Sequence, residues 1–477
     1  MIPGGSMDKY SFRIYDSETP KYIQIYKYIK KQIDLNNIED GEKLPSIRDL
    51  SKLLKVNNVT IVSAYKKLQS EGYAAQKMGS GTFAKRKDSA KSFKREYSET
   101  FKSINGDEIK KYIDFTGETA CGDFFPVSTF KEVLNKVLDR DGIDALSYQE
   151  ALGYKGLRKN INKFFWNNTL NMDNILIVSG AQQGIDIVSK ALLNTNDNIV
   201  VEKPTYSGAL NVFKWRRANI FEVNMESDGI DVDQLERIAM KNNIKCFYTM
   251  SYFQNPTGIS CSLEKKKRII ELSNIYDFYI IEDDYLSELI YDKFLEYRSF
   301  KSLDKYDRVI YIKSFSKIFL PGIRIGYLIS PSIFNESIQN SKINTDISTS
   351  SLMQRALDLY IEKGFWKEYI SRLNTFYKSK YNYTYNCLIN ILKDKISFIP
   401  PRGGLHFYIK ISDEINMDSI ELFYKCRENK VLISPGVLFY KNSNEGKKYY
   451  RMGFTQTDNE KIKEGIEIIN KILQDVN

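Results

Sequence analysis

The spacing of apolar residues predicts three short helices and a hairpin in the first 86 residues. Apolar side chains recur every three or four positions over 22–33, 44–56 and 59–73, which is the period of amphipathic helices. Residues 74–86 then predict two short strands around a Met-Gly-Ser-Gly turn. Three helices followed by such a hairpin form a winged helix-turn-helix, whose third helix enters the DNA major groove. On this pattern alone, a small helical module that binds protein remains an alternative.

Beyond residue 111, short apolar runs alternate with amphipathic stretches. The runs are rich in Ile, Val and Tyr, and they are NILIVSG, NIVVEKPTY, IKCFYTM, FYIIEDDY, RVIYIKSFS and RIGYLIS. Near-continuous apolar strands joined by helices predict an α/β fold with a mostly parallel sheet, covered on both faces. In such sheets ligands bind at the carboxyl ends of the strands. Residues 87–111 are polar and lack a clear period, so we expect them to be a linker between the two parts, with a little helix as an open alternative.

Composition narrows the chemistry that this chain of 477 residues can carry out. It has one histidine, His406, and five scattered cysteines without a CxxC pair, so metal sites, disulfides and histidine triads are not expected. No apolar run reaches the roughly 18 residues of a membrane helix, and we expect a cytoplasmic protein that does not bind membranes. Residues 1–87 hold 16 Lys and Arg against 9 Asp and Glu, which accounts for +7 of the net charge of +10. This basic surplus favours DNA as the partner of the N-terminal part.

Unusual residues collect where the predicted strands end. The first strand is followed by Gly180, Ala181 and Gln182, where the free N–H groups of a helix start suit a phosphate. The next strand ends supply an aromatic ring, an amide, two carboxylates with a phenol, and an amine. A phosphorylated pyridine aldehyde needs all of these groups. An amine forms a Schiff base with it, a carboxylate keeps its ring nitrogen protonated, and Ser and Arg bind its phosphate. We therefore predict pyridoxal 5'-phosphate (PLP) as the cofactor.

Residues 110–477 resemble the fold-type I, class I aminotransferases through the motifs SGAQQG, EKPTY, NPTG, EDDY and SFSKIFLPGIR. The resemblance implies a large PLP-binding domain over 112–334 and a smaller C-terminal α+β domain over 335–477. It implies that Lys317 is the catalytic, Schiff-base residue and that Arg451 holds a substrate carboxylate.

The same resemblance assigns the other cofactor contacts. Tyr206 would stack on the ring, Asn255 and Tyr285 would bond its oxygen, and Asp283 would meet its nitrogen, with Asp284 as an alternative. The full set of predicted cofactor-binding residues is Ala181, Gln182, Tyr206, Asn255, Asp283, Tyr285, Ser314, Ser316, Lys317 and Arg324.

Residues 44–83 resemble the GntR-type DNA-binding domain, with its Pro-Ser-x-Arg entry and Gly-x-Gly-Thr-Phe wing, so we assign residues 10–86 to this domain. The resemblance implies DNA contacts by Arg48, by the start of the third helix and by the wing glycines. Asn58 stands where the family often has an arginine. The helical pattern adds further exposed polar positions, and the predicted DNA-binding residues are Ser46, Arg48, Asn57, Asn58, Thr60, Ser63, Lys66, Lys67, Gly79 and Gly81.

The order of the two parts resembles the MocR family of bacterial transcriptional regulators over nearly the whole chain. The resemblance implies a head-to-tail homodimer that senses PLP or an amino compound through Lys317 and changes its binding to paired DNA half-sites. Members that sense γ-aminobutyrate carry an arginine two residues after the stacking tyrosine, where this chain has Gly208. Two alternatives stay open. One is an active aminotransferase with an accessory DNA-binding domain, and the other is a DNA-binding protein whose large domain has lost the cofactor and only dimerises.

Overall fold

The chain folds into two compact units, Met1–Ser103 and Ile104–Asn477. This computed structural model describes residues 7–16, 19–34, 37–39, 41–77, 80–85, 89–103, 106–319 and 321–475. Within these ranges no helix is long and apolar enough to cross a membrane.

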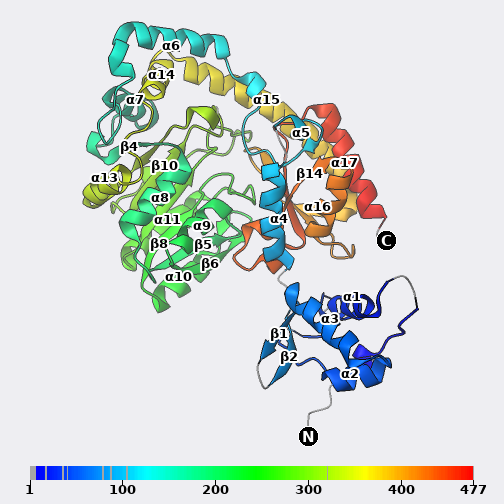
Figure 1. Ribbon diagram of the computed structural model, residues 1–477. Coiled ribbons are helices and arrows are strands. Elements are labelled where there is room, and N and C mark those ends of the chain that lie inside the picture. The colour runs from blue at the N-terminus through cyan, green and yellow to red at the C-terminus, as the bar shows by residue number, and fades with distance from the viewer. Residues whose placement is uncertain are drawn as a thin grey trace. The chain divides into compact units, whose positions relative to one another are not determined.

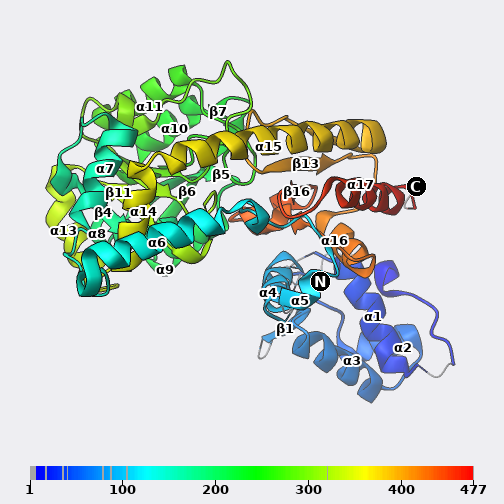
Figure 2. The same ribbon diagram turned by 90° about the horizontal axis from the view of Figure 1, so that it is seen from above.

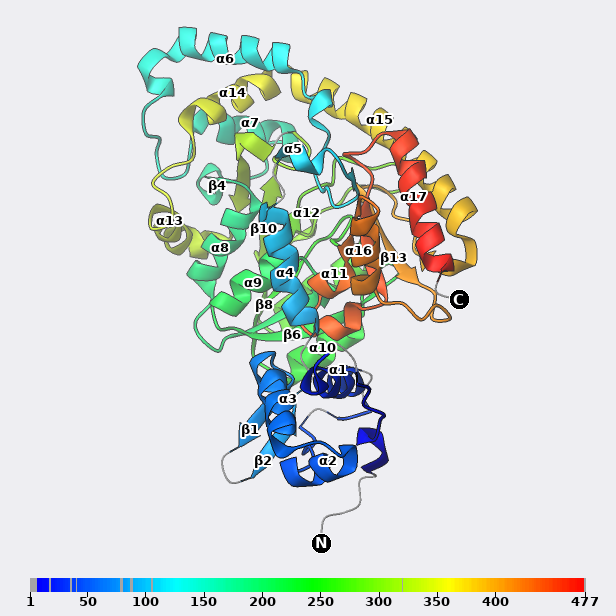
Figure 3. The same cartoon turned by 45° about the vertical axis from the view of Figure 1, so that its right-hand side comes forward.

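The N-terminal unit is a winged helix-turn-helix, as the apolar spacing predicts (Figure 3). The helices and strands of the winged helix-turn-helix are α1 Lys21–Asp34, α2 Ile47–Leu54, α3 Asn58–Ser70, β1 Ala74–Lys77 and β2 Gly81–Ala84. The third helix, α3, packs on α1 and α2 through a buried stripe of Ile61, Ala64, Tyr65 and Leu68. The strands β1 and β2 pair antiparallel and form the wing. The opposite face of α3 is therefore left for solvent or a partner.

The stretch predicted as a linker contains a helix, α4 Ser89–Ser103. Its rings Phe93, Tyr97 and Phe101 recur every four residues and contact one another along the helix, with centroids 5.7 and 4.6 Å apart. Arg95 and Glu99, also four residues apart, form an ion pair. Such i,i+4 pairs each stabilise a helix by only about 0.2–0.5 kcal/mol. The sequence gives only a weak amphipathic signal for this helix, because charged residues flank its narrow aromatic stripe.

The C-terminal unit is built on an eight-stranded sheet ordered β4-β11-β10-β9-β8-β5-β6-β7 (Figure 1). In chain order the strands are β4 Ile175–Val178, β5 Asn198–Lys203, β6 Asn219–Glu226, β7 Gly229–Ile230, β8 Ile244–Thr249, β9 Tyr279–Asp284, β10 Val309–Ser314 and β11 Gly326–Ile329. The central strands run parallel, whereas β11 is antiparallel to both of its neighbours and β7 is antiparallel to β6. All six apolar runs of the sequence become strands, so the prediction of a mostly parallel sheet is confirmed.

Helices cover both faces of this sheet. In Figure 2 the strands lie between α10 and α11 on one side and α8 and α9 on the other. The helices of this part are α5 Gly106–Ile109, α6 Val127–Asp141, α7 Lys155–Trp166, α8 Ala181–Leu192, α9 Ser207–Trp215, α10 Val232–Lys241, α11 Leu263–Ile275, α12 Phe300–Leu303, α13 Asn335–Ile343 and α14 Ser351–Glu362. Because α13 packs on α8 and α14 packs on α6 and α7, residues 335–362 pack with the large domain rather than with the small one.

The end of the chain folds as a smaller α+β domain around a four-stranded sheet ordered β12-β13-β16-β15. Its elements are α15 Phe365–Cys387, β12 Ile396–Phe398, β13 His406–Ile411, α16 Ser419–Glu428, β14 Val431–Leu432, β15 Ser434–Pro435, β16 Tyr449–Gly453 and α17 Asn459–Gln474. The helices α15 and α17 lie side by side in Figures 1 and 3. A short strand from the start of the unit, β3 Ile113–Asp114, pairs parallel with β14. This pairing holds residues 115–121 close to the small domain.

Candidate functional site

A cavity of about 160 Å³ lies at the carboxyl ends of β4, β5, β8, β9 and β10. Every residue predicted to bind the cofactor lines it, and Glu118 and Met250 complete the wall. The full lining is Glu118, Ala181, Gln182, Tyr206, Met250, Asn255, Asp283, Tyr285, Ser314, Ser316, Lys317 and Arg324. These residues come from segments that are distant in sequence, and the parallel strands bring their ends to one edge of the sheet.

Lys317 follows β10 and extends its amine into this cavity. The Nζ atom lies 2.8 Å from Oε2 of Glu118, and the Lys317 carbonyl accepts a hydrogen bond of 2.8 Å from the Ala120 N–H. Burial lowers the pKa of the Lys317 ammonium below its usual value. A lowered pKa makes the neutral, nucleophilic amine more abundant near neutral pH.

One end of the cavity is suited to an anion. Gly180, with φ 94°, turns the chain from β4 into α8, whose first N–H groups are free of helical partners. This positive φ favours glycine, and a Cβ atom here would also lie 2.9 Å from Nη2 of Arg324. Arg324 donates from Nη2 to the Ser179 carbonyl at 2.7 Å. The hydroxyl of Ser316 is buried without a hydrogen-bond partner among the described residues.

The adjacent carboxylates at the end of β9 point to different surroundings, as successive strand residues do. Asp283 lines the cavity and accepts a hydrogen bond of 2.7 Å from the Tyr248 hydroxyl at Oδ2. Its Oδ1 atom is buried and has no partner in the described part of the chain. Burial raises the pKa of Asp283 to about 6. This free oxygen is placed to receive a cationic N–H group from a ligand.

Asp284 is bonded to the protein instead of to the cavity. It accepts hydrogen bonds of 2.7 Å each from the hydroxyls of Tyr297, Tyr311 and Ser287, and Lys313 donates to it at 3.0 Å. Burial acts to raise the pKa of Asp284, but the Lys313 ammonium and the three hydroxyl donors act to lower it. The pKa of Asp284 therefore falls below its usual value. The geometry therefore favours Asp283, of the two aspartates, as the group that faces a ligand.

The remaining polar walls are Tyr206, Tyr285 and Asn255. The Tyr206 hydroxyl donates to Oε1 of Gln182 at 3.1 Å, and the Tyr285 hydroxyl donates to the Phe253 carbonyl at 2.6 Å. Asn255 donates from Nδ2 to Glu118 at 3.2 Å. Together the cavity offers an amine, an anion cradle, an aromatic ring and an unpaired carboxylate oxygen, which are the groups that PLP requires.

Arg451 lies behind this wall rather than in the lining of the cavity. It is buried and donates to Oδ1 of Asn255 at 2.8 Å and to a carboxylate oxygen of Glu118. Sequence reasoning missed Glu118, which sits in the irregular segment FTGETACGD. The only sequence signal was an acidic residue between small polar ones. That pattern does not show that Glu118 lines the cavity, because its contacts with Lys317 and Arg451 form only in the folded chain.

The predicted DNA-binding residues fall into distinct groups. Ser46 and Asn57 cap α2 and α3, accepting from the N–H of Asp49 at 3.2 Å and of Thr60 at 2.8 Å. The Thr60 hydroxyl donates to the same Asn57 oxygen. These three side chains are thus engaged in capping.

Other members of the set are more available. Arg48, Asn58 and Lys66 are exposed, whereas Ser63 and Lys67 are half-buried. Lys67 forms an ion pair of 3.0 Å with Glu71. Gly81 is exposed and begins β2 with φ 114°, and Gly79 lies outside the described residues.

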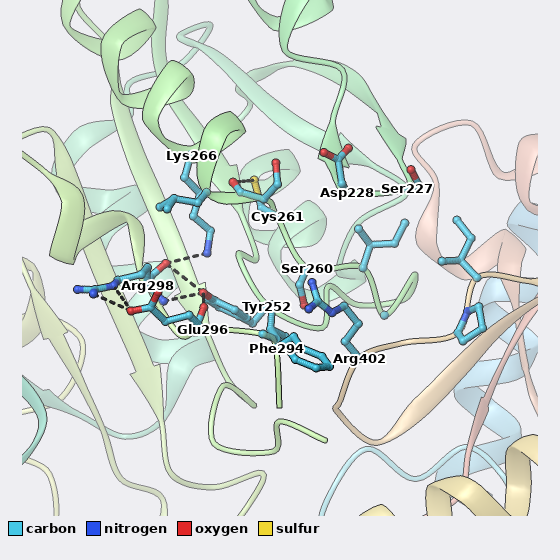
Figure 4. A pocket seen from close by; sticks show the side chains of 17 residues that line it. Ser227, Asp228, Tyr252, Ser260, Cys261, Lys266, Phe294, Glu296, Arg298 and Arg402 are labelled. Carbon is cyan, nitrogen blue, oxygen red and sulfur yellow. Dashed lines mark hydrogen bonds and ion pairs between the residues drawn. The ribbon is translucent and has the colours of Figure 1, made fainter. Parts of the chain in front are cut away.

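A larger cavity, of about 350 Å³, is partly lined by the loop after β8 (Figure 4). Its buried lysine, Lys266, donates to the Arg298 carbonyl at 2.7 Å and lies 3.7 Å from the centroid of the Tyr252 ring. Arg298 pairs with Glu296, and Arg402 pairs with Asp292. These three cations are engaged within the chain. None of the residues predicted to bind the cofactor lines this cavity.

Two family descriptions match the chain, "Aminotransferase class I and II" over residues 121–469 and "Bacterial regulatory proteins, gntR family" over residues 21–84. The uncharacterized HTH-type transcriptional regulator YdfD of Bacillus subtilis is 28% identical over 475 residues, covering 96% of this chain and 97% of YdfD.

Solved structures match the aminotransferase part. A kynurenine aminotransferase from Pyrococcus horikoshii is 28% identical with a TM-score of 0.75, and the match covers 80% of this chain and 94% of that one. LysN, an α-aminoadipate aminotransferase from Thermus thermophilus complexed with N-(5'-phosphopyridoxyl)-L-leucine, is 26% identical with a TM-score of 0.72. That match covers 77% and 93% of the two chains.

Proposed function

This chain belongs to the aminotransferase class I and II family and carries a GntR-type DNA-binding domain ahead of it in a MocR-like architecture, and from that premise we propose its function. It is a transcriptional regulator whose affinity for DNA depends on PLP, or on an amino compound, sensed through a Schiff base on Lys317. It acts in the cytoplasm as a head-to-tail homodimer on paired half-sites.

The observation that carries the proposal is the presence of both sites in one chain. Exposed Arg48, Asn58 and Lys66 lie on one unit, and a complete set of cofactor groups lines the cavity of the other. The match to a transcriptional regulator over 96% of the chain supports the same conclusion. A large domain that has lost its cofactor and only dimerises would have no use for these converging groups.

Pyridoxal 5'-phosphate is the cofactor of the aminotransferase unit. When bound, it supplies an aldehyde that condenses with amines and a ring that withdraws electrons. Lys317 would hold the aldehyde carbon, and Asp283 would keep the ring nitrogen protonated. Arg324, Ser314, Ser316 and the N-terminus of α8 would bind the phosphate, and Tyr206 would cover the ring.

Ligand binding changes DNA affinity only if it stabilises one arrangement of the dimer over another. Two DNA-binding units must match half-sites separated by whole turns of DNA, so a change in their relative placement alters affinity. Footprinting of the full chain on DNA upstream of its own gene tests this. We expect two protected half-sites, and a single half-site, or no protection at moderate salt, would contradict the proposal.

Substituting Arg48 or Lys66 with alanine is expected to weaken DNA binding and to make it less dependent on salt. Each lost phosphate contact releases about one fewer counterion, so the slope of log K against log salt falls by about 1. Fluorescence anisotropy titrations from about 50 to 200 mM salt measure this slope. Lys363→Ala, an exposed lysine on the other unit, serves as the control and should leave the slope unchanged.

PLP retention is expected to weaken as the pH falls through about 6. The raised pKa of Asp283, about 6, means that its carboxylate is ionised above this pH and protonated below it. Only the ionised form balances the charge of a protonated ring nitrogen. The charged or titratable groups that influence the pKa of Asp283 are Tyr248, Asp284, Lys313 and Lys317.

Absorbance after dialysis at a series of pH values gives the retained fraction of PLP, and Asp283→Asn should retain little PLP at any pH. If the loss of PLP near pH 6 persisted in Asp283→Asn, the titrating group would be a residue other than Asp283.

A second candidate is an active aminotransferase that carries the DNA-binding unit as an accessory. The Lys317 amine, whose pKa is lowered by burial, and the unpaired oxygen of Asp283 favour it, because proton transfer and cofactor activation use these groups. Mixing the loaded protein with an amino donor and a keto acid separates the two. Sustained turnover with ligand-independent DNA binding would support the enzyme over the regulator.

A further inference from the structure

The carboxylate of Glu118 contacts both Lys317 and Arg451 and lines the cofactor cavity. Its Oε2 atom is 2.8 Å from Nζ of Lys317, and its Oε1 atom accepts from Nη1 of Arg451 and, at 3.2 Å, from Nδ2 of Asn255. A side chain of this protein therefore sits on the guanidinium that is expected to hold the carboxylate of an amino acid.

The terminal nitrogens of Arg451 have no N–H group left for a further carboxylate. Nη1 donates to Glu118 and to Asn255 at 2.8 Å, and Nη2 donates to the Thr116 carbonyl at 3.2 Å and to the Ser434 hydroxyl at 3.3 Å. Each terminal nitrogen carries two hydrogens, so all four are engaged. A ligand carboxylate needs two parallel N–H groups, and to bind at Nη1 it would have to displace Glu118 and lie beside its charge.

The segment that carries Glu118 is held on both sides. Before it, the Gly453 N–H donates to the Phe115 carbonyl at 2.7 Å, and the side chain of Asp114 accepts from Thr116 at both N and Oγ1. After it, Gln456 donates to the Thr119 carbonyl at 3.0 Å. Glu118 is thus presented to the cavity by a fixed backbone.

We propose that Glu118 is a built-in carboxylate that excludes α-amino acids, so that the effector is a primary amine without an α-carboxylate. This inference rests on the proposed sensing of an amino compound at the same site. Where Oε2 now meets the Lys317 ammonium, it would meet the ammonium of an incoming amine. An amine thus gains an ion pair from Glu118, and the corresponding amino acid meets a like charge.

Calorimetry of the PLP-loaded full chain with matched ligand pairs tests the inference directly. Ethylamine against alanine, and cadaverine against lysine, differ only in the α-carboxylate. We expect each amine to bind at least tenfold more tightly than its amino acid. In Glu118→Gly and Glu118→Gln the preference should shrink or reverse, while Glu362→Gln, an exposed glutamate elsewhere, should keep it. Equal or tighter binding of the amino acids to the unaltered protein would overturn the inference, whether or not the variants fold.

Failure of this inference can be told apart from failure of the regulator proposal. DNA titrations with the same ligands supply the second readout. If amines bind preferentially but no ligand changes DNA affinity, the regulator proposal fails and the inference stands. If α-amino acids, and not amines, bind and change DNA affinity, the inference fails and the regulator proposal stands.

Discussion

Replacing Lys317 with alanine is expected to abolish covalent capture of PLP while DNA binding is retained. Among the described residues that line the cavity, Lys317 is the one lysine, so no other amine among them is positioned to take up the aldehyde. Borohydride reduction followed by peptide mass spectrometry should place a phosphopyridoxyl group on residue 317 of the unaltered protein and on no residue of the variant.

The control for this experiment is Lys363→Ala, which removes an exposed lysine of the same unit. It should keep the adduct on Lys317 and the visible absorbance of the loaded protein. A full-strength adduct in Lys317→Ala, or loss of DNA binding together with the adduct, would contradict the assigned role.

Replacing Lys313 with alanine is expected to cost about 3–5 kcal/mol of stability, because it leaves buried carboxylates unpaired. Its Nζ atom donates to Asp284 at 3.0 Å, Ser287 at 2.9 Å and Glu288 at 2.7 Å, and the Lys313 and Asp284 side chains are almost fully buried. The three tryptophans, Trp166, Trp215 and Trp366, all belong to the C-terminal unit. Urea unfolding followed by tryptophan fluorescence therefore reports on the unit that holds Lys313.

An exposed ion pair provides the comparison. Lys136 pairs with Glu132 at 2.6 Å, and both side chains are more than half exposed to solvent. Lys136→Ala should change the free energy of unfolding by less than about 1 kcal/mol. If Lys313→Ala were no more destabilising than Lys136→Ala, the buried network would not support β9 and β10 as described.

Much of the cofactor site follows from sequence because its residues stand where apolar runs stop. Parallel strands bring such ends together. The convergence of Tyr206, Asn255, Asp283 and Lys317 can therefore be predicted without knowing how the side chains pack. The choice between Asp283 and Asp284 needed the structure, since it depends on which face of β9 meets the Lys313 network.

Other features depended on contacts that no local pattern reveals. Glu118 and Arg451 are 333 residues apart, and their pairing arises only when the segment after β3 lies against the small domain. Asn57 and Thr60 were predicted as DNA contacts, but their side chains bond each other at the start of α3. Helix capping competes for the same polar residues that suit DNA, and sequence alone does not separate the two uses.

The most direct test of the account is the DNA affinity of the full chain in different ligand states. Fluorescence anisotropy with a duplex from upstream of its own gene would compare the cofactor-free protein, the PLP-loaded protein and the loaded protein with a primary amine. A sensor should show at least a fivefold difference between two of these states, the lower end of common allosteric couplings. The difference should vanish in Lys317→Ala. Equal affinity in every state, with PLP captured on Lys317, would contradict the claim that this aminotransferase unit regulates DNA binding.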